Sequence, residues 1–174
     1  MMIKPANIIW FTGLSGVGKT TLSKILKKEL IRRKYKVLSI DGDIFRKKTK
    51  NIDTFTRENI LKNNLKIIRY IKNLQHKFNF ILVSVISPLS KSRALAKKKF
   101  KKKYFECYLK CSLKELKKRD TKGLYELARK NKIRNLIGYN SKIKYQKSRY
   151  KVIMIDTHRN NLKKCLEKIL INIL

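Results

Sequence analysis

The chain has 174 residues, 43% of them hydrophobic, which is enough for one domain with a substantial core. Lysine and arginine number 46 against 11 acidic residues, so the formal net charge is +35. This composition excludes a disordered chain, and no apolar run approaches the roughly 20 residues that a membrane-spanning helix needs. The first residues lack the pattern of a signal peptide, so we expect a cytoplasmic protein.

The large positive charge predicts non-specific binding of polyanions at low salt. Lysine, isoleucine and asparagine are all abundant, however, and an AT-rich coding sequence would give the same composition without selection for binding. The densest lysine run, at 97–103, fits a solvated helix, and no RNA-binding signature accompanies it. We therefore predict no specific nucleic-acid partner and no membrane partner.

Short apolar segments alternate with helical patterns along the chain. In chain order, we expect strands at 7–12, 35–41, 78–86, 104–111 and 151–156. The helices are expected directly after residue 20 and at 57–76, 89–103, 112–119 and 160–174. This alternation predicts an α/β fold in which a five-stranded parallel sheet is covered by helices on both faces.

One long helix and one charged segment complete this outline. The helix at 57–76 carries its expected buried stripe at Leu61, Leu65, Ile68, Ile71 and Leu74. The segment 120–148 has many charged residues, two glycines and few large apolar residues in series, which is typical of a mobile lid over phosphates. No repeat or flexible linker divides the chain, so we expect residues 1–174 to form a single domain.

The stretch Gly13-Leu14-Ser15-Gly16-Val17-Gly18-Lys19-Thr20 matches G-x-x-x-x-G-K-[ST], the phosphate-binding P-loop. An apolar strand precedes it and a helix follows, so backbone N–H groups and the positive end of the helix dipole would face a polyphosphate. Lys19 would reach the β- and γ-phosphates, and the Thr20 hydroxyl would bind Mg²⁺. The motif therefore predicts a nucleotide but does not specify the reaction.

A second polar stretch, Asp41-Gly42-Asp43, follows the predicted strand at 35–41. In a parallel α/β sheet the site opens at the carboxyl ends of the strands. One carboxylate there could hold Mg²⁺ through water, and the other could accept a proton from an attacking hydroxyl. Arg46 follows closely and suits bidentate capture of an acidic group. An ordinary turn after a strand would look the same, and the neighbouring P-loop favours the catalytic interpretation.

The chain resembles the adenylyl-sulfate (APS) kinase family, which phosphorylates the 3′-hydroxyl of APS with ATP. The residues 10–20 look like the family's W-L-T-G-L-S-G-x-G-K-[ST], and Asp41-Gly42-Asp43 with Arg46 looks like its D-G-D-x-x-R. Further similarities, covering nearly the whole chain, are Phe55-Thr56 to G-F-S, Asn63 to the last residue of D-R-x-E-N, Ile86-Ser87-Pro88 to F-I-S-P, Arg119 to Tyr125 to R-D-P-K-G-L-Y, and Ile155-Asp156-Thr157 to I-D-T.

This resemblance implies a three-layer P-loop NTPase fold with a lid at 120–148, and ATP and Mg²⁺ as cofactors. It implies that Lys19 is catalytic, that Asp43 is the metal-linked carboxylate and candidate base, with Asp41 close by, and that Thr20 also holds the metal. Arg119 and the lid would lie over ATP. The acceptor APS would be held by Arg46, Phe55, Asn63, Ile86, Ser87, Lys122 and Leu136, with Phe55 stacking on its adenine.

Two further implications concern Ser87 and the oligomeric state. Ser87 corresponds to a serine that carries phosphate in some family members, and the other interpretation is a strand-terminating hydroxyl beside the substrate. Family members are commonly dimers, so a homodimer is expected.

The chain departs from the family pattern mainly on the acceptor side. Ile60 occupies the position of a family arginine that contacts APS. Arg57, one helical turn earlier, could supply the cation, or Ile60 could simply be core and Arg57 solvated. Leu136 replaces a second aromatic stacking partner, and Thr121 replaces the proline of R-D-P.

Three functions are therefore open. The first is ATP-dependent phosphorylation of APS to 3′-phosphoadenosine 5′-phosphosulfate (PAPS) and ADP, in sulfate assimilation. The second is a related P-loop kinase that acts on another small hydroxyl or nucleotide acceptor. The third is a nucleic-acid-binding protein on a P-loop fold, which the retained Lys19, Thr20 and Asp43 argue against.

Overall fold

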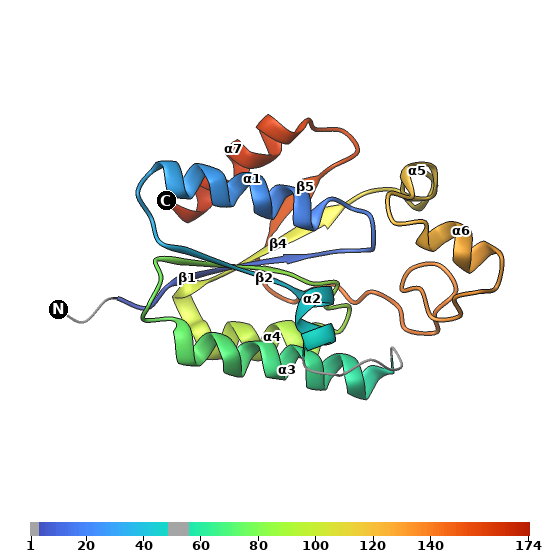
Figure 1. Cartoon of the computed structure of the whole chain (residues 1–174), viewed down its shortest axis with the longest axis horizontal. Helices are drawn as coiled ribbons and strands as arrows, with labels where there is room; N and C mark the ends of the chain where they lie inside the picture. The colour runs from blue at the N-terminus through green and yellow to red at the C-terminus, as the bar shows by residue number, and fades with distance from the viewer. Residues whose placement is uncertain (1–3, 49–55) are drawn as a thin grey trace.

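The computed structural model describes residues 4–48 and 56–174, and within these ranges five parallel strands form the centre of the protein (Figure 1). They are β1 (Asn7–Thr12), β2 (Val37–Asp41), β3 (Phe80–Ser84), β4 (Tyr104–Lys110) and β5 (Ile153–Asp156). They pair in the order β2-β3-β1-β4-β5, and each neighbouring pair is parallel. The predicted sheet is confirmed, although β2, β3 and β5 each begin two residues later than their apolar patterns indicated.

Helices cover both faces of the sheet and make three layers (Figure 1). One face carries α1 (Lys19–Arg32) and α7 (Leu162–Ile173), and the other carries α3 (Arg57–Leu74) and α4 (Ser90–Phe100). Three shorter helices lie toward the carboxyl ends of the strands: α2 (Gly42–Lys48), α5 (Leu113–Arg119) and α6 (Leu124–Arg129). A 3-10 turn, Lys101–Lys103, leads into β4. In the part of the chain that the structure describes, no helix is long and apolar enough to cross a membrane.

The core is divided by β1, which lies in the middle of the sheet and sends successive side chains to opposite faces. Ile9 and Phe11 belong to the core that α1 and α7 cover, and Ile8 and Trp10 belong to the core that α3 and α4 cover. All four side chains are fully buried. The strand that leads into the P-loop is therefore fixed from both sides.

The buried face of α3 differs from the predicted stripe. It consists of Ile60, Asn63, Asn64, Ile67, Ile68 and Ile71. Ile68 and Ile71 were predicted correctly, whereas Leu61, Leu65 and Leu74 are only half-buried. The prediction followed apolar residues alone and missed this face because two asparagines occupy it in the first half of the helix.

Segment 120–148, the predicted lid, is packed more closely than its composition indicated. It contains α6 and buries Tyr125, Ala128, Leu136 and Ile137. Tyr125 and Leu136 belong to the same apolar cluster as Val17 of the P-loop. Because these residues are irregularly spaced, the sequence pattern did not reveal that the segment packs on the P-loop.

The packing of α7 can be tested with two isoleucines that lie two residues apart. Ile169 is 0% exposed and Ile171 is 82% exposed. We expect Ile169→Ala to lower the free energy of unfolding by about 2–5 kcal/mol, since it leaves a cavity in the core. Ile171→Ala should change it by about 0.5 kcal/mol or less. Urea unfolding followed by circular dichroism measures both values, and equal losses would contradict the packing described for α7.

Candidate active site

The loop between β1 and α1 brings backbone N–H groups to the carboxyl edge of the sheet. Its Gly13 and Gly18 have φ angles of 140° and 96°, which residues with a side chain rarely adopt. A Cβ atom on Gly13 would lie 2.5 Å from the carbonyl oxygen of Leu109 on β4. Gly18 caps α1 without a side-chain hydrogen bond. The first N–H groups of the helix are thus left for an anion.

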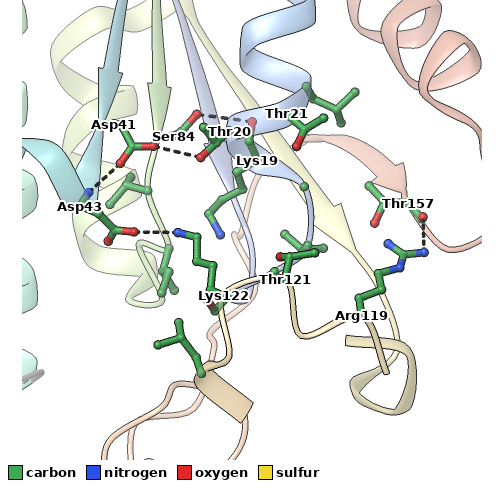
Figure 2. A pocket seen from close by; sticks show the side chains of 18 of the residues that line it. Lys19, Thr20, Thr21, Asp41, Asp43, Ser84, Arg119, Thr121, Lys122 and Thr157 are labelled. Carbon is green, nitrogen blue, oxygen red and sulfur yellow. Dashed lines mark hydrogen bonds and ion pairs between the residues drawn. The ribbon is translucent and has the colours of Figure 1, made fainter. Parts of the chain in front are cut away.

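A pocket of about 1100 Å³ opens beside this loop (Figure 2). Single small molecules usually occupy pockets of roughly 300–1,000 Å³, so this one has room for two substrates. Its walls come from the P-loop, the ends of β2 and β3, the lid segment and the start of α7. The predicted site residues that line it are Ser15, Gly16, Val17, Gly18, Lys19, Thr20, Asp41, Asp43, Arg46, Ile86, Arg119, Lys122 and Leu136.

Lys19 lies at the centre of the phosphate side of this pocket. Its Nζ donates to the carbonyl oxygens of Gly13 and Leu14, at 3.0 and 2.7 Å. Burial, and then the charge of Lys122, lower the pKa of Lys19 to about 7, although Asp43 and Asp41 oppose the shift. The ammonium group therefore loses its proton near neutral pH unless an anion comes close.

Thr20 connects the P-loop to the end of β2. Its hydroxyl donates to Asp41 Oδ2 at 2.9 Å (Figure 2). The other oxygen of Asp41 accepts the backbone N–H groups of Asp43, at 2.9 Å, and Ile44, at 3.4 Å. Asp41 thus fixes the start of α2 and holds the Thr20 side chain at the same time.

Asp43 stands between the P-loop and the lid. Its Oδ1 accepts from Arg46 at 2.8 Å, and its Oδ2 accepts from Lys122 at 2.9 Å. Burial alone would raise the pKa of Asp43, but the hydrogen bond from Lys122 and the charges of Lys122, Arg46 and Lys19 outweigh it and lower the pKa. Asp43 is therefore ionised at neutral pH, and it brings together two cations that the sequence predicted for the acceptor.

The lid contacts the P-loop through groups that the sequence patterns did not reveal. The hydroxyl of Tyr125 donates to the carbonyl oxygen of Ser15 at 3.0 Å. A Cβ atom on Gly138 would lie 2.6 Å from the Leu14 side chain, so this glycine lets the lid approach closely. Tyr125 had been noted only as part of the R-D-x-K-G-L-Y match. Its burial depends on tertiary packing that spacing does not encode.

Arg119 lies on the opposite side of the pocket from Asp43 (Figure 2). It donates to Glu115 Oε1 at 2.8 Å and to the carbonyl oxygen of Thr157 at 3.1 Å. The residue therefore joins the end of α5 to the loop after β5. Arg119 and Thr157 both line the pocket, and the role predicted for Arg119 over the nucleotide stays a prediction.

Several predicted residues lie outside the pocket lining. Gly13 and Leu14 shape the P-loop without lining the pocket, and Phe55 falls outside the described residues. Ser87 is 1% exposed, and its hydroxyl lies 3.4 Å from that of Ser92 rather than in the pocket. Asn63 is 6% exposed, and its Oδ1 has no hydrogen-bond partner among the described residues. The roles predicted for Ser87 and Phe55 stay predictions.

Ile60 is part of the core, as one of the two interpretations had it, and the cation role predicted for Arg57 stays a prediction. Ile60 is buried against Leu89 and Ile137, whereas Arg57 is exposed at the start of α3. Ile60 is thus part of an apolar cluster that connects α3 to the lid.

One buried group near the site was missed entirely. Arg93 had been read as part of a basic, solvated helix, yet it is 0% exposed and pairs with Glu106 at 3.1 Å. Arg93 lies on the same helical face as Ala96 and Phe100, which are also buried. The helical spacing of these three residues was the signal in the sequence from which the burial of Arg93 could have been predicted.

Comparison with known proteins supports the resemblance found in the sequence. The family model for adenylylsulphate kinase matches residues 5–156. The adenylyl-sulfate kinase of Clostridium acetobutylicum is 31% identical, over 98% of this chain and 84% of the relative. The probable adenylyl-sulfate kinase of Archaeoglobus fulgidus is 34% identical, over 88% of this chain and 97% of the relative.

The fold comparison agrees. The structure of the Mycobacterium tuberculosis APS kinase CysC in complex with AMPPNP and APS superimposes with a TM-score of 0.86, at 25% identity, over 95% of this chain and 96% of that one. Since a family model spans most of the sequence and relatives match over nearly its full length, the chain belongs to the adenylylsulphate kinase family.

Proposed function

We propose that this protein transfers the γ-phosphoryl group of ATP to the 3′-hydroxyl of APS, which gives PAPS and ADP. The observation that carries the proposal is one pocket of about 1100 Å³ in which the P-loop faces a cluster of acceptor-side charges. The names of the relatives support APS as the acceptor. The Mycobacterium tuberculosis structure holds an ATP analogue and APS together, which supports simultaneous binding of two substrates.

The ATP half of the pocket is proposed to run from the P-loop to Arg119. The uncapped start of α1 would receive the phosphates, and Lys19 would exchange the carbonyl oxygens of Gly13 and Leu14 for phosphate oxygens. Arg119 and the loop at Thr157 are placed to border the nucleoside. Contacts of the lid with Ser15 would help to exclude water, which suppresses hydrolysis of ATP.

The residues beside Lys19 fit a magnesium ion. Thr20, Asp41 and Asp43 supply hydroxyl and carboxylate oxygens, the hard ligands that Mg²⁺ prefers. The described residues contain no cluster of three metal-binding His, Cys, Asp or Glu side chains. Such a site suits Mg²⁺, which keeps several waters and takes the rest of its ligands from substrate phosphates. When bound there, the ion would neutralise part of the charge on those phosphates.

The acceptor half is proposed to consist of Arg46, Lys122 and Leu136. Arg46 and Lys122 are both held by Asp43, so their charges are already gathered where an anionic sulfate–phosphate group would bind. Asn63 was also predicted to hold APS, but it is buried outside the pocket lining, so it is not assigned to this half. Leu136 would cover the adenine by apolar contact.

Asp43 is better suited to position groups than to remove a proton. The surrounding cations lower its pKa, so it is a weak base in this state. Phosphoryl transfer has a loose transition state and depends mainly on alignment and charge neutralisation. We therefore propose that Asp43 orients the acceptor hydroxyl and holds the cations at the junction of the two halves.

A transfer assay with γ-labelled ATP and Mg²⁺ tests this function. It compares APS with AMP, adenosine and a panel of small hydroxylated metabolites, at moderate salt to suppress polyanion binding. We expect labelled 3′-phospho-APS as the main product. Asp43→Asn should lower the rate about 100-fold or more, because the acceptor hydroxyl and the two cations lose the carboxylate that positions them.

Asp156→Asn serves as the matched control. Asp156 also ends a parallel strand, but it does not line the pocket, and its asparagine variant keeps an oxygen for the N–H groups of His158 and Arg159. Its rate should stay within about threefold of the wild type. Transfer to another acceptor instead of APS would support a kinase activity and would refute the proposal that APS is the substrate. The burial of Ile60 makes that the leading alternative.

The pKa of Lys19 makes a second prediction, about protons taken up on ATP binding. At pH 8 the ligand-free side chain, with a pKa near 7, is mostly neutral. Bound phosphates favour the charged form and raise this pKa, so binding should take up close to one proton per site at pH 8 and almost none at pH 6. Calorimetry in buffers of different ionisation enthalpy measures the uptake.

The control for this measurement is Lys19→Arg, since a guanidinium stays protonated throughout the pH range. Its ATP binding should take up no proton at pH 8. Equal uptake by the variant and the wild type would show that another group titrates.

A further inference from the structure

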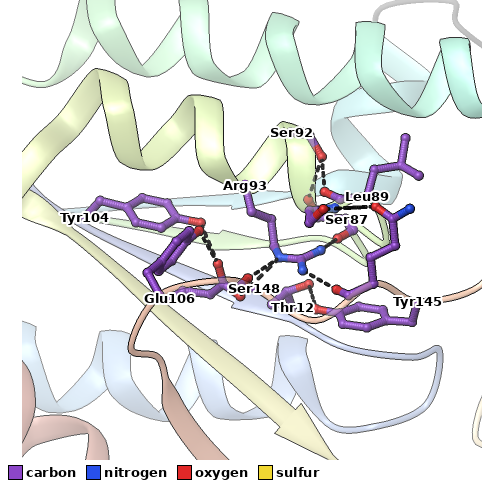
Figure 3. A network of polar contacts seen from close by, with 12 residues as sticks. Thr12, Ser87, Leu89, Ser92, Arg93, Tyr104, Glu106, Tyr145 and Ser148 are labelled. Carbon is purple, nitrogen blue, oxygen red and sulfur yellow. Dashed lines mark hydrogen bonds and ion pairs between the residues drawn. The ribbon is translucent and has the colours of Figure 1, made fainter.

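A fully buried ion pair belongs to a network of polar contacts that includes Ser87 of the loop after β3 (Figure 3). Arg93 on α4 and Glu106 on β4 meet at 3.1 Å, with side chains 0% and 2% exposed. Ser148 donates to Glu106 at 2.7 Å, and Tyr150 donates to its other oxygen at 2.6 Å. Removing two charges from water costs free energy that their pairing only partly returns, so a buried ion pair is weak evidence of added stability. We therefore looked for another role of this network in its remaining hydrogen bonds.

The remaining N–H donors of Arg93 bind the backbone of two other chain segments. Its guanidinium donates to the backbone carbonyl oxygens of Ser87 and Gln146 (Figure 3). Ser87 belongs to the loop after β3, and Gln146 lies near the end of the lid segment 120–148. One side chain therefore binds two chain segments that flank the acceptor side.

A second contact holds the same loop one residue earlier. The Thr12 hydroxyl donates to the carbonyl oxygen of Ile86 at 2.5 Å and lies 2.7 Å from the hydroxyl of Tyr145. Because the single Thr12 proton is used on Ile86, Tyr145 must be the donor in the second bond. Burial raises the pKa of Tyr145, which keeps that proton in place. The guanidinium of Arg93 also lies 4.9 Å from the centre of the Tyr145 ring.

The loop that these contacts hold is in an uncommon conformation. Ser87 has φ of 45°, in the left-handed region that costs most residues about 1–3 kcal/mol and persists only when the surroundings enforce it. Ile86 lines the pocket, whereas Ser87 is turned into the protein. The turn at Ser87 thus determines which side chain of the loop faces the acceptor.

We infer that Arg93 and Tyr145 are positioning residues, which together hold the 86–87 loop in the conformation that shapes the acceptor side of the pocket. The inference rests on the proposed function for the identity of the acceptor, but its structural part does not. ATP binding should not depend on this clamp, since Lys19 and Thr20 are held by other partners.

The test uses two tyrosines, because replacing Arg93 would leave Glu106 buried and unpaired and could unfold the protein. Tyr145→Phe removes the bond to Thr12. Tyr150→Phe is the matched control: it removes a tyrosine bond to one oxygen of Glu106, and the other oxygen keeps its ion pair with Arg93. For Tyr145→Phe we expect KM for APS to rise about 3- to 10-fold, the effect of one hydrogen bond, with KM for ATP unchanged. Tyr150→Phe should change neither KM.

Hydrogen–deuterium exchange supplies a readout that needs no acceptor. The amides of Val85, Ile86 and Ser87 should exchange faster in Tyr145→Phe than in the wild type, and at the wild-type rate in Tyr150→Phe. Unchanged exchange and unchanged KM in Tyr145→Phe would overturn the inference, as would equal effects of the two substitutions. A wild-type protein that does not phosphorylate APS would refute the proposed function alone, and the exchange result would still decide the inference.

Discussion

Repulsion between cations in a partly desolvated pocket is the constraint that shapes this site. Burial, and after it the charge of Lys122, lower the pKa of Lys19. Four cations of the site bind acceptors of the protein: Lys19 binds two P-loop carbonyls, Lys122 and Arg46 bind Asp43, and Arg119 binds Glu115. In these contacts, oxygen atoms of the protein take the places that oxygen atoms of two anionic substrates would occupy. The ligand-free site is thus balanced by bonds that substrates can replace.

The two halves of the pocket are joined by short connections at the carboxyl edge of the sheet. Thr20 ties α1 to Asp41 at the end of β2, and Thr12 ties the end of β1 to the loop after β3. Thr12 directly precedes the P-loop and Thr20 is its last residue, so both sides of the pocket are held in place relative to this loop. The lid contacts the P-loop through the Tyr125 hydroxyl, and Gly138 leaves the space for this close approach. Alignment of two substrates, which phosphoryl transfer requires above all, follows from that arrangement.

Much of this could be predicted from the sequence, because the decisive signals are local. The glycine spacing, Lys19 and Thr20 define the P-loop within eight residues, and strand–helix alternation defines the sheet. The pairing of Asp43 with Lys122 joins residues 79 positions apart, so only the fold reveals it. Arg93 was missed because composition marked its helix as solvated, while burial depends on Glu106 across a tertiary contact. The burial of Asn63 and Asn64 in α3 was not predicted, because a search for apolar periodicity passes over polar residues.

The central claim is that substrates displace the bonds that now hold the site's cations. A crystal structure with a non-hydrolysable ATP analogue and APS bound together tests it most directly. The account predicts that Lys19 Nζ leaves the carbonyl oxygens of Gly13 and Leu14 for phosphate oxygens, and that Lys122 leaves Asp43 for the acceptor. A complex with both ligands bound and with the Lys122–Asp43 ion pair and the Lys19 carbonyl contacts intact would contradict the account.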